Sequence, residues 1–205
     1  MKKIVSTTLL LLAISMTNAQ NEQKPNAFAN FQEFINNTPS LSFEFQLKQR
    51  TTGDIFMLGG IANYQLKKIT PKNQTQKVET EIWGVLVEDI VYINSFLYSE
   101  IKGYNKILEK GYYSYFIGEP ARLLEQQRNL GIIGANDKVV AVCCQVGYVI
   151  LPDGKIMLLT PKLLFELCKD NEQISEKIQQ SHLIMEDVPQ MFEILKEYNL
   201  SKKYN

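Results

Sequence analysis

The sequence predicts an α+β fold, an antiparallel β-sheet followed by C-terminal helices, with a partly closed barrel as the alternative form of the sheet. Three observations lead to this prediction. Phe43, Phe45 and Leu47 alternate with polar residues, as in a half-buried antiparallel strand. Short strand-like segments separated by turn residues continue to about residue 159. Helical spacing dominates after residue 160, and strands first with helices last is typical of this class.

The first 19 residues have the three parts of an export signal. Met1-Lys2-Lys3 is positively charged, Ile4 to Ile14 is apolar, and Ala19 is a small residue at the expected cleavage position. The apolar run is too short for a membrane span, which needs about 20 residues. We therefore expect cleavage after Ala19 and an exported protein, periplasmic or secreted. No Cys follows the cleavage position, so a lipoprotein anchor is not expected.

The mature chain is expected to hold a single domain after a short lead-in. Residues 20–40 form a polar lead-in with a short amphipathic helix over 26–36, where Phe28, Phe31 and Ile35 share a face. Residues 41–205 form the α+β domain, with the sheet over about 41–159 and the helices over about 160–200. This length is sufficient for one hydrophobic core without disulfide support.

The strands are predicted from apolar segments and from the turns between them. Glu88-Asp89 joins one strand pair, and Pro152-Asp153-Gly154 is the strongest turn signal in the chain. Residues 70–77 are expected to form a polar loop, and 118–137 a less regular segment. The expected strands are 42–48, 55–58, 61–69, 78–87, 90–94, 104–108, 112–117, 139–151 and 155–159.

Capping residues predict three helices in the last third of the chain. Thr160 is an N-cap with Pro161 at the first helical position. Asn171 caps a second helix through about Gln180, and Asp187 with Gln190 resembles a capping box that opens a third.

Charge and motif content exclude several functions. The signal carries two of the 22 basic residues and none of the 22 acidic ones, so the mature chain has a net charge of −2, which does not attract nucleic acid. After the signal, no segment is long and apolar enough to span a membrane. Gly131 and Gly134 do not match a phosphate loop, and a single histidine, His182, rules out two-His metal sites. We expect no cofactor and no metal.

Three cysteines leave two interpretations open. In an exported protein, a disulfide can form between Cys168 and one of the adjacent pair Cys143 and Cys144, for which we take Cys144. Only one of the pair can face Cys168, because neighbouring strand residues point to opposite faces. The alternative is three small buried side chains in a strand and a helix.

Two arrangements would suit a small hydrolase. Cys168 and His182 could form a nucleophile–base dyad, although nothing in the surrounding sequence supports it. Glu79 and Glu81 would share one face of the predicted strand, beside Trp83. Solvated charges and a surface histidine explain the same residues more simply.

The densest aromatic cluster lies between residues 92 and 116. On the strand 112–117, Tyr112 and Phe116 are expected on one face and Tyr113 and Tyr115 on the other. If one face is open, its rings can anchor a partner or a ligand. Aromatic pairing inside the fold is the alternative. The candidate binding residues are Tyr92, Tyr112, Tyr113, Tyr115 and Phe116.

Several segments together resemble a family of exported Gram-negative bacterial proteins of unknown function. The resemblance extends from about residue 40 to the end. It implies export and a single domain, and it carries no known activity. The segments are Glu81-Ile82-Trp83-Gly84-Val85, Val91-Tyr92-Ile93-Asn94-Ser95, Gly111-Tyr112-Tyr113-Ser114-Tyr115-Phe116-Ile117-Gly118, Tyr148-Val149-Ile150-Leu151-Pro152-Asp153-Gly154-Lys155, Leu159-Thr160-Pro161, Cys168-Lys169-Asp170-Asn171 and Lys196-Glu197-Tyr198-Asn199.

The sequence therefore favours an exported binding or interaction domain of the bacterial envelope, without enzymatic activity, whose partner is a protein or a small ligand. A small periplasmic or secreted hydrolase is one alternative. A structural subunit of an envelope assembly, with an uncovered sheet edge, is the other.

Overall fold

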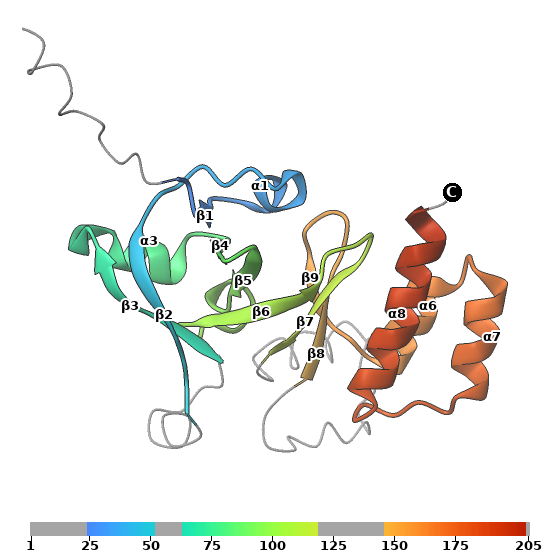
Figure 1. Cartoon of the computed structure of the whole chain (residues 1–205). Helices are drawn as coiled ribbons and strands as arrows, with labels where there is room; N and C mark the ends of the chain where they lie inside the picture. The colour runs from blue at the N-terminus through green and yellow to red at the C-terminus, as the bar shows by residue number, and fades with distance from the viewer. Residues whose placement is uncertain (1–23, 52–62, 119–145, 204–205) are drawn as a thin grey trace, which may run out of the picture.

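The computed structural model describes residues 24–51, 63–118 and 146–203. A curled antiparallel sheet forms a half-barrel, and three C-terminal helices stand beside its end (Figure 1). The predicted α+β class is therefore confirmed, and the curl agrees with the alternative of a partly closed barrel.

The sheet follows the order β1-β4-β5-β6-β7-β8-β9, and all its pairs are antiparallel. β2 pairs with β3, and β3 joins β6 at the pair Tyr64↔Tyr104. The strands are β1 (Ala27–Phe28), β2 (Glu44–Gln49), β3 (Tyr64–Thr70), β4 (Gly84–Val87), β5 (Ile90–Asn94), β6 (Tyr104–Glu109), β7 (Ser114–Gly118), β8 (Val146–Ile150) and β9 (Ile156–Leu158). The expected segments 55–58 and 118–137, and the first part of 139–151, lie largely or wholly outside the described residues.

The helix in the N-terminal lead-in is shorter than the apolar spacing predicts. Residues 27–28 form β1, and α1 (Phe31–Asn36) begins only after Asn30, whose side chain accepts the backbone N–H of Glu33 at 3.0 Å. This N-cap stops the helix from extending back to residue 26. Asn37, in the left-handed region with φ of 54°, ends it.

The segment 70–83 differs most from the prediction. Instead of a loop and a strand, it forms the 3-10 helix η1 (Lys72–Gln74) and the helix α3 (Thr75–Thr80). Val78 and Ile82 are both buried and lie four residues apart, so the apolar positions follow a helical turn. Tyr104 donates a hydrogen bond to the Val78 carbonyl, which fixes the turn against β6. Glu79 and Glu81 consequently do not share a strand face.

The predicted turns fit the structure where it is described. Glu88 and Asp89 connect β4 to β5 with φ of 50° and 64°. Residues 152–154 connect β8 to β9, and Gly154 has a φ of 87°, a value that favours glycine. β7 begins at Ser114 rather than Tyr112, and its register with β6 shifts between Ile107 and Glu109.

The C-terminal helices are α6 (Pro161–Cys168), α7 (Glu172–Gln180) and α8 (Val188–Lys203). The first two predicted caps are confirmed: Thr160 accepts the backbone N–H of Leu163 at 3.0 Å, and Asn171 that of Ile174 at 3.2 Å. Before α8, the Asp187 carboxylate accepts the N–H of Ile184 at 2.9 Å. No helix in the described ranges is long and apolar enough to cross a bilayer.

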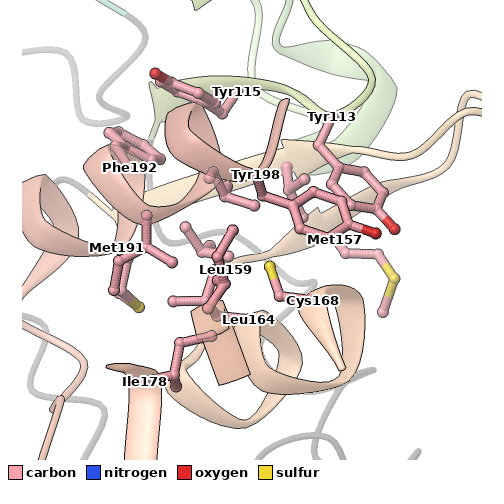
Figure 2. Packing of buried hydrophobic residues seen from close by; sticks show 14 residues of the cluster. Tyr113, Tyr115, Met157, Leu159, Leu164, Cys168, Ile178, Met191, Phe192 and Tyr198 are labelled. Carbon is pink, nitrogen blue, oxygen red and sulfur yellow. The ribbon is translucent and has the colours of Figure 1, made fainter. Parts of the chain in front are cut away.

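The sheet separates two cores at its C-terminal end. Tyr115 and Val149 face the helices and pack with Leu159, Leu164, Phe192 and their neighbours (Figure 2). Phe116 and Tyr148, one residue along each strand, face the opposite core, which contains Phe28, Phe34 and Trp83. This alternation is the one expected of a sheet that is covered on both faces.

Candidate functional site: an aromatic hollow

Four of the five predicted binding residues are buried side chains. Tyr92 is 7% exposed, Tyr113 8%, Tyr115 5% and Phe116 0%. The Tyr113 ring stacks on Tyr198 and the Tyr115 ring on Phe192, at centroid distances of 5.6 Å and 4.5 Å (Figure 2). Burial raises the pKa of both Tyr113 and Tyr115. These rings therefore contribute to the packing of α8 on the sheet.

Tyr112 is the exception, with 49% of its surface exposed. Its ring lies 5.8 Å from the Lys202 ammonium, which also pairs with Asp170. Asp170 accepts a second hydrogen bond, of 2.7 Å, from the Tyr198 hydroxyl. The polar groups beside Tyr112 are thus engaged with one another.

Cys168, the candidate nucleophile of a thiol hydrolase, is a buried residue. Cys168 is 0% exposed, and burial, together with Asp170, raises its pKa to about 12. A thiol with so high a pKa stays protonated at neutral pH and is a poor nucleophile. His182, by contrast, is exposed in the turn after α7 with a φ of 47°. Cys143 and Cys144 lie outside the described residues, so the Cys144–Cys168 disulfide stays a prediction.

The two candidate catalytic carboxylates, Glu79 and Glu81, lie in α3 and at its C-terminal end. Glu79 of α3 forms an ion pair with Lys102 at 2.7 Å. Glu81 is exposed at the C-terminal end of the same helix. Across the three described ranges, no group of three or more His, Cys, Asp or Glu side chains could hold a metal ion.

A hollow of about 540 Å³ instead brings together four segments that are distant in the sequence. They are α1, the residue before β4, the short helix α4 (Phe96–Ser99), and the turn between β8 and β9. We call this site the aromatic hollow. It is lined by Phe31, Trp83, Phe96, Leu97, Tyr98, Glu100, Asp153, Gly154, Lys155 and Ile156.

The base of the aromatic hollow is a cluster of packed rings. Trp83 stacks on Phe34 at 4.2 Å and lies 6.1 Å from the Phe31 ring. Lys110 extends from the end of β6 to the Phe34 carbonyl, at 2.6 Å, and holds α1 in place. Over this base, Phe31 and Phe96 are partly exposed and Leu97 is 41% exposed. The site therefore presents apolar groups to solvent on a well-packed support.

Buried polar residues fix the position of α4. Asn94 is 0% exposed; its carbonyl oxygen accepts the N–H of Phe96 at 3.0 Å and its amide donates to the Ile82 carbonyl at 2.9 Å. The Ser99 hydroxyl donates to the Ser95 carbonyl at 2.8 Å. A four-residue helix is unstable alone, so these hydrogen bonds are needed to hold Phe96 and Leu97 in place.

Asn105 of β6 connects this network to the sheet. Its amide donates to the Ser95 hydroxyl at 3.0 Å and to the Tyr98 hydroxyl at 2.6 Å. Its carbonyl oxygen accepts the backbone N–H and the side-chain amide of Asn63. A buried network satisfied in this way favours one conformation of the wall, and a rigid wall is what a binding site requires.

Charged residues form the rim of the aromatic hollow. Glu100 ends α4 in the left-handed region, with a φ of 56°. Asp153 accepts the backbone N–H of Lys155 at 3.0 Å, which orders the turn opposite. The Phe31 ring packs on that turn so closely that a Cβ at Gly154 would lie 2.7 Å from it. Two carboxylates and one ammonium therefore surround an apolar opening.

None of the hollow's residues was predicted as a site from the sequence. Trp83 was named as a neighbour of Glu81, Asp153 and Gly154 as a turn, and all three as parts of segments that carry the family resemblance. The local signal that could have pointed to it is the pair Phe96-Leu97, two large apolar residues at the end of a strand before Glu100. The site becomes visible only when residues near 31, 83, 97 and 154 are brought together.

Comparison with models of protein families finds a family that matches this chain. A search of curated proteins and a search of solved structures find no match to this chain. The family of unknown function DUF6563 matches residues 26–202, which covers most of the chain and includes every segment of the aromatic hollow. The chain therefore belongs to the family of unknown function DUF6563.

Proposed function

We propose that this protein is an exported binding domain of the bacterial envelope, without enzymatic activity, and that the aromatic hollow is its binding site. The observation that carries the proposal is Leu97, which is 41% exposed on a helix held rigidly by buried hydrogen bonds. Exposed apolar groups on an ordered support are typical of binding surfaces. The hollow replaces the tyrosine face as the site that we favour.

The chemistry of the hollow supports binding over catalysis. Its charged groups, Glu100, Asp153 and Lys155, are all exposed side chains at the rim. Catalytic acids, bases and nucleophiles are usually activated by burial or by a close charged partner. At a rim that is open to water, burial does not supply this activation, because solvent screens the charges.

The export part of the proposal is supported by residues 1–19. Their basic start, apolar centre and small residue at position 19 are features of a cleaved signal.

Native mass spectrometry of the protein from its own cells tests both parts. The periplasmic fraction and the culture medium should yield a mass that corresponds to residues 20–205, with an additional bound mass. Leu97→Asp should remove the bound mass and leave the fold intact. Leu200→Asp is the matched control, because Leu200 is 50% exposed on α8. Equal bound mass in both variants would reject the hollow as the site.

A structural subunit is the second candidate, because β2 pairs with β3 alone among the described strands. Against this candidate, the register shift between Glu44 and Gln46 and the charged Lys48 are features that protect such an edge from pairing. Assembly through this edge predicts particles whose mass rises with concentration in light scattering. A constant monomer mass would argue against it.

A further inference from the structure

We infer that the outer edge of β9 pairs with an extended polypeptide segment, whose alternate apolar side chains enter the aromatic hollow. This inference rests on the proposed binding function and specifies its ligand. Three observations lead to it: the direction of the backbone groups of Ile156, the regular and apolar character of this edge, and the face of the sheet on which the Ile156 side chain lies.

The backbone of Ile156 is directed away from the sheet. β9 is the last strand in the sheet order, and its one partner among the described strands is β8. Leu151 donates its N–H to the Lys155 carbonyl at 2.9 Å, so these two residues form a hydrogen-bonded pair. The two kinds of pair alternate along antiparallel strands, so the next pair, Ile150↔Ile156, is a non-hydrogen-bonded one. The N–H and C=O of Ile156 therefore point outward, and neither has a partner within the described ranges.

The other edges of the described sheet are occupied or irregular. Leu41 covers the outer side of β1, where it exchanges two backbone hydrogen bonds with Ala27. The edge strand β2 has a register shift after Glu44 and carries the charged Lys48. In contrast, β9 has a continuous register and consists of three apolar residues. Its short length is its one protection, so pairing with another chain is favoured at this edge.

The face on which Ile156 lies connects the edge to the hollow. Ile156 lines the hollow and packs on the core that contains Trp83. Directly opposite residues of an antiparallel pair place their side chains on the same face of the sheet. A ligand residue paired with Ile156 would therefore direct its side chain into the hollow, and so would the residue two positions away. Phe31 and Leu97 offer these side chains apolar contact.

The open part of the edge is short. Leu158 is fully buried, so the edge is accessible at Ile156 and at the turn before it. One antiparallel pair at Ile156 supplies two hydrogen bonds. The hollow, with a volume of about 540 Å³, has room for a few side chains, and their apolar contacts supply the rest of the affinity. The recognised element is therefore a short extended segment rather than a long strand.

Trp83 provides a direct measurement, because it is the only tryptophan of the chain and lines the hollow. The mature protein should be titrated with acetyl-Ser-Leu-Ser-Phe-Ser-amide while Trp83 emission is recorded. One modified probe carries N-methyl groups on the Leu and Phe amides, which would face β9. The matched probe carries them on the second and third Ser amides, which would face away. We expect the first modification to weaken binding at least about tenfold, a difference of about 1.4 kcal/mol, and the second to change it less than about threefold.

Two variants test the protein side of the pairing. Ile156→Pro removes the outward N–H and no hydrogen bond to β8, a position at which a sheet edge tolerates proline. Ile156→Ala is the matched control, because it also shortens the side chain but keeps the N–H. We expect Ile156→Pro to bind the unmodified peptide about fivefold more weakly than Ile156→Ala. Far-ultraviolet circular dichroism confirms that both variants are folded.

The outcomes separate the mode of binding from the proposed function. Equal affinity for the two N-methylated probes, or equal binding by Ile156→Pro and Ile156→Ala, overturns strand pairing but leaves a binding site at the hollow. No change in Trp83 emission with any of the three probes also overturns the inference. In that case the loss or retention of bound mass in Leu97→Asp decides the proposed function separately.

Discussion

Asn105 donates a hydrogen bond of 2.6 Å to the hydroxyl of Tyr98, a residue of α4, the helix that forms one wall of the aromatic hollow. Asn105→Leu keeps the approximate shape of the side chain and leaves Tyr98, Ser95 and Asn63 without this partner. Each buried polar group left unpaired costs about 1–3 kcal/mol, so we expect the free energy of unfolding to fall by about 3 kcal/mol. Urea denaturation followed by Trp83 emission measures this change.

An exposed asparagine provides the control for that experiment. Asn73 lies on the surface in η1, and Asn73→Leu should change the free energy of unfolding by no more than about 0.5 kcal/mol. If Asn105→Leu behaves like this control, the hydrogen-bond network does not stabilise α4, and the argument for a rigid wall fails.

Gly154 and Phe31 give a second prediction, for the opposite wall. Gly154→Ala places a Cβ 2.7 Å from the Phe31 ring and adopts a φ of 87°. A left-handed conformation costs a non-glycine residue about 1–2 kcal/mol, and the steric overlap increases this loss. In a Phe31→Ala background the overlap disappears but the backbone cost stays. The effect of Gly154→Ala should therefore be smaller there, and strict additivity would show that ring and turn do not interact.

Local sequence rules predicted the parts of the fold that local contacts determine. Thr160 and Asn171 cap their helices through residues three positions away, so the chain near each cap was sufficient to identify it. Phe43, Phe45 and Leu47 alternate because β2 has one inner face. The α+β class followed from the order of such elements.

Distant contacts determined what the sequence did not reveal. The Val78 carbonyl in α3 accepts a hydrogen bond from Tyr104, 26 residues later, a contact that no local pattern predicts. The tyrosines at 113 and 115 are buried because α8 packs on them with Tyr198 and Phe192. The aromatic hollow depends on four separate segments, and no pattern within one segment predicts that they meet.

Asp170 predicts a pH dependence of stability. Hydrogen bonds from Lys202 and then Tyr198 lower the pKa of its carboxyl group. A lowered pKa in the folded state adds stability above the ordinary value of about 3.9, and this stability is lost as pH falls through the folded-state pKa. The stability difference between wild type and Asp170→Asn should therefore decrease between pH 6 and pH 2. The effect should be small and weaker in high salt, because the ion pair is exposed.

Urea titrations at several pH values and two salt concentrations measure this difference. Lys202→Met removes the strongest cause of the pKa shift, so the pH-dependent effect of Asp170→Asn should be reduced in that background. A difference that stays constant with pH in the wild-type background would show that Lys202 and Tyr198 do not perturb the carboxyl group.

We predict that the fold protects the Cys168 thiol from chemical labelling. It is fully buried, and its pKa is raised to about 12, so the reactive thiolate is scarce at pH 8. In a reduced protein with Cys143→Ser and Cys144→Ser, labelling by Ellman's reagent should be at least about a hundredfold slower in the native state than in urea, because it requires opening of the core. Similar rates in both states would place Cys168 at an accessible surface.

The unreduced, exported protein tests the predicted disulfide. A bridge to Cys168 makes the chain lighter by the mass of two hydrogen atoms, and Cys168→Ser should abolish this difference. Single variants then identify the partner: if it is Cys144, Cys143→Ser keeps the bridge and Cys144→Ser loses it. If neither the wild-type protein nor any variant shows the deficit of two hydrogen atoms, the three cysteines stay reduced after export.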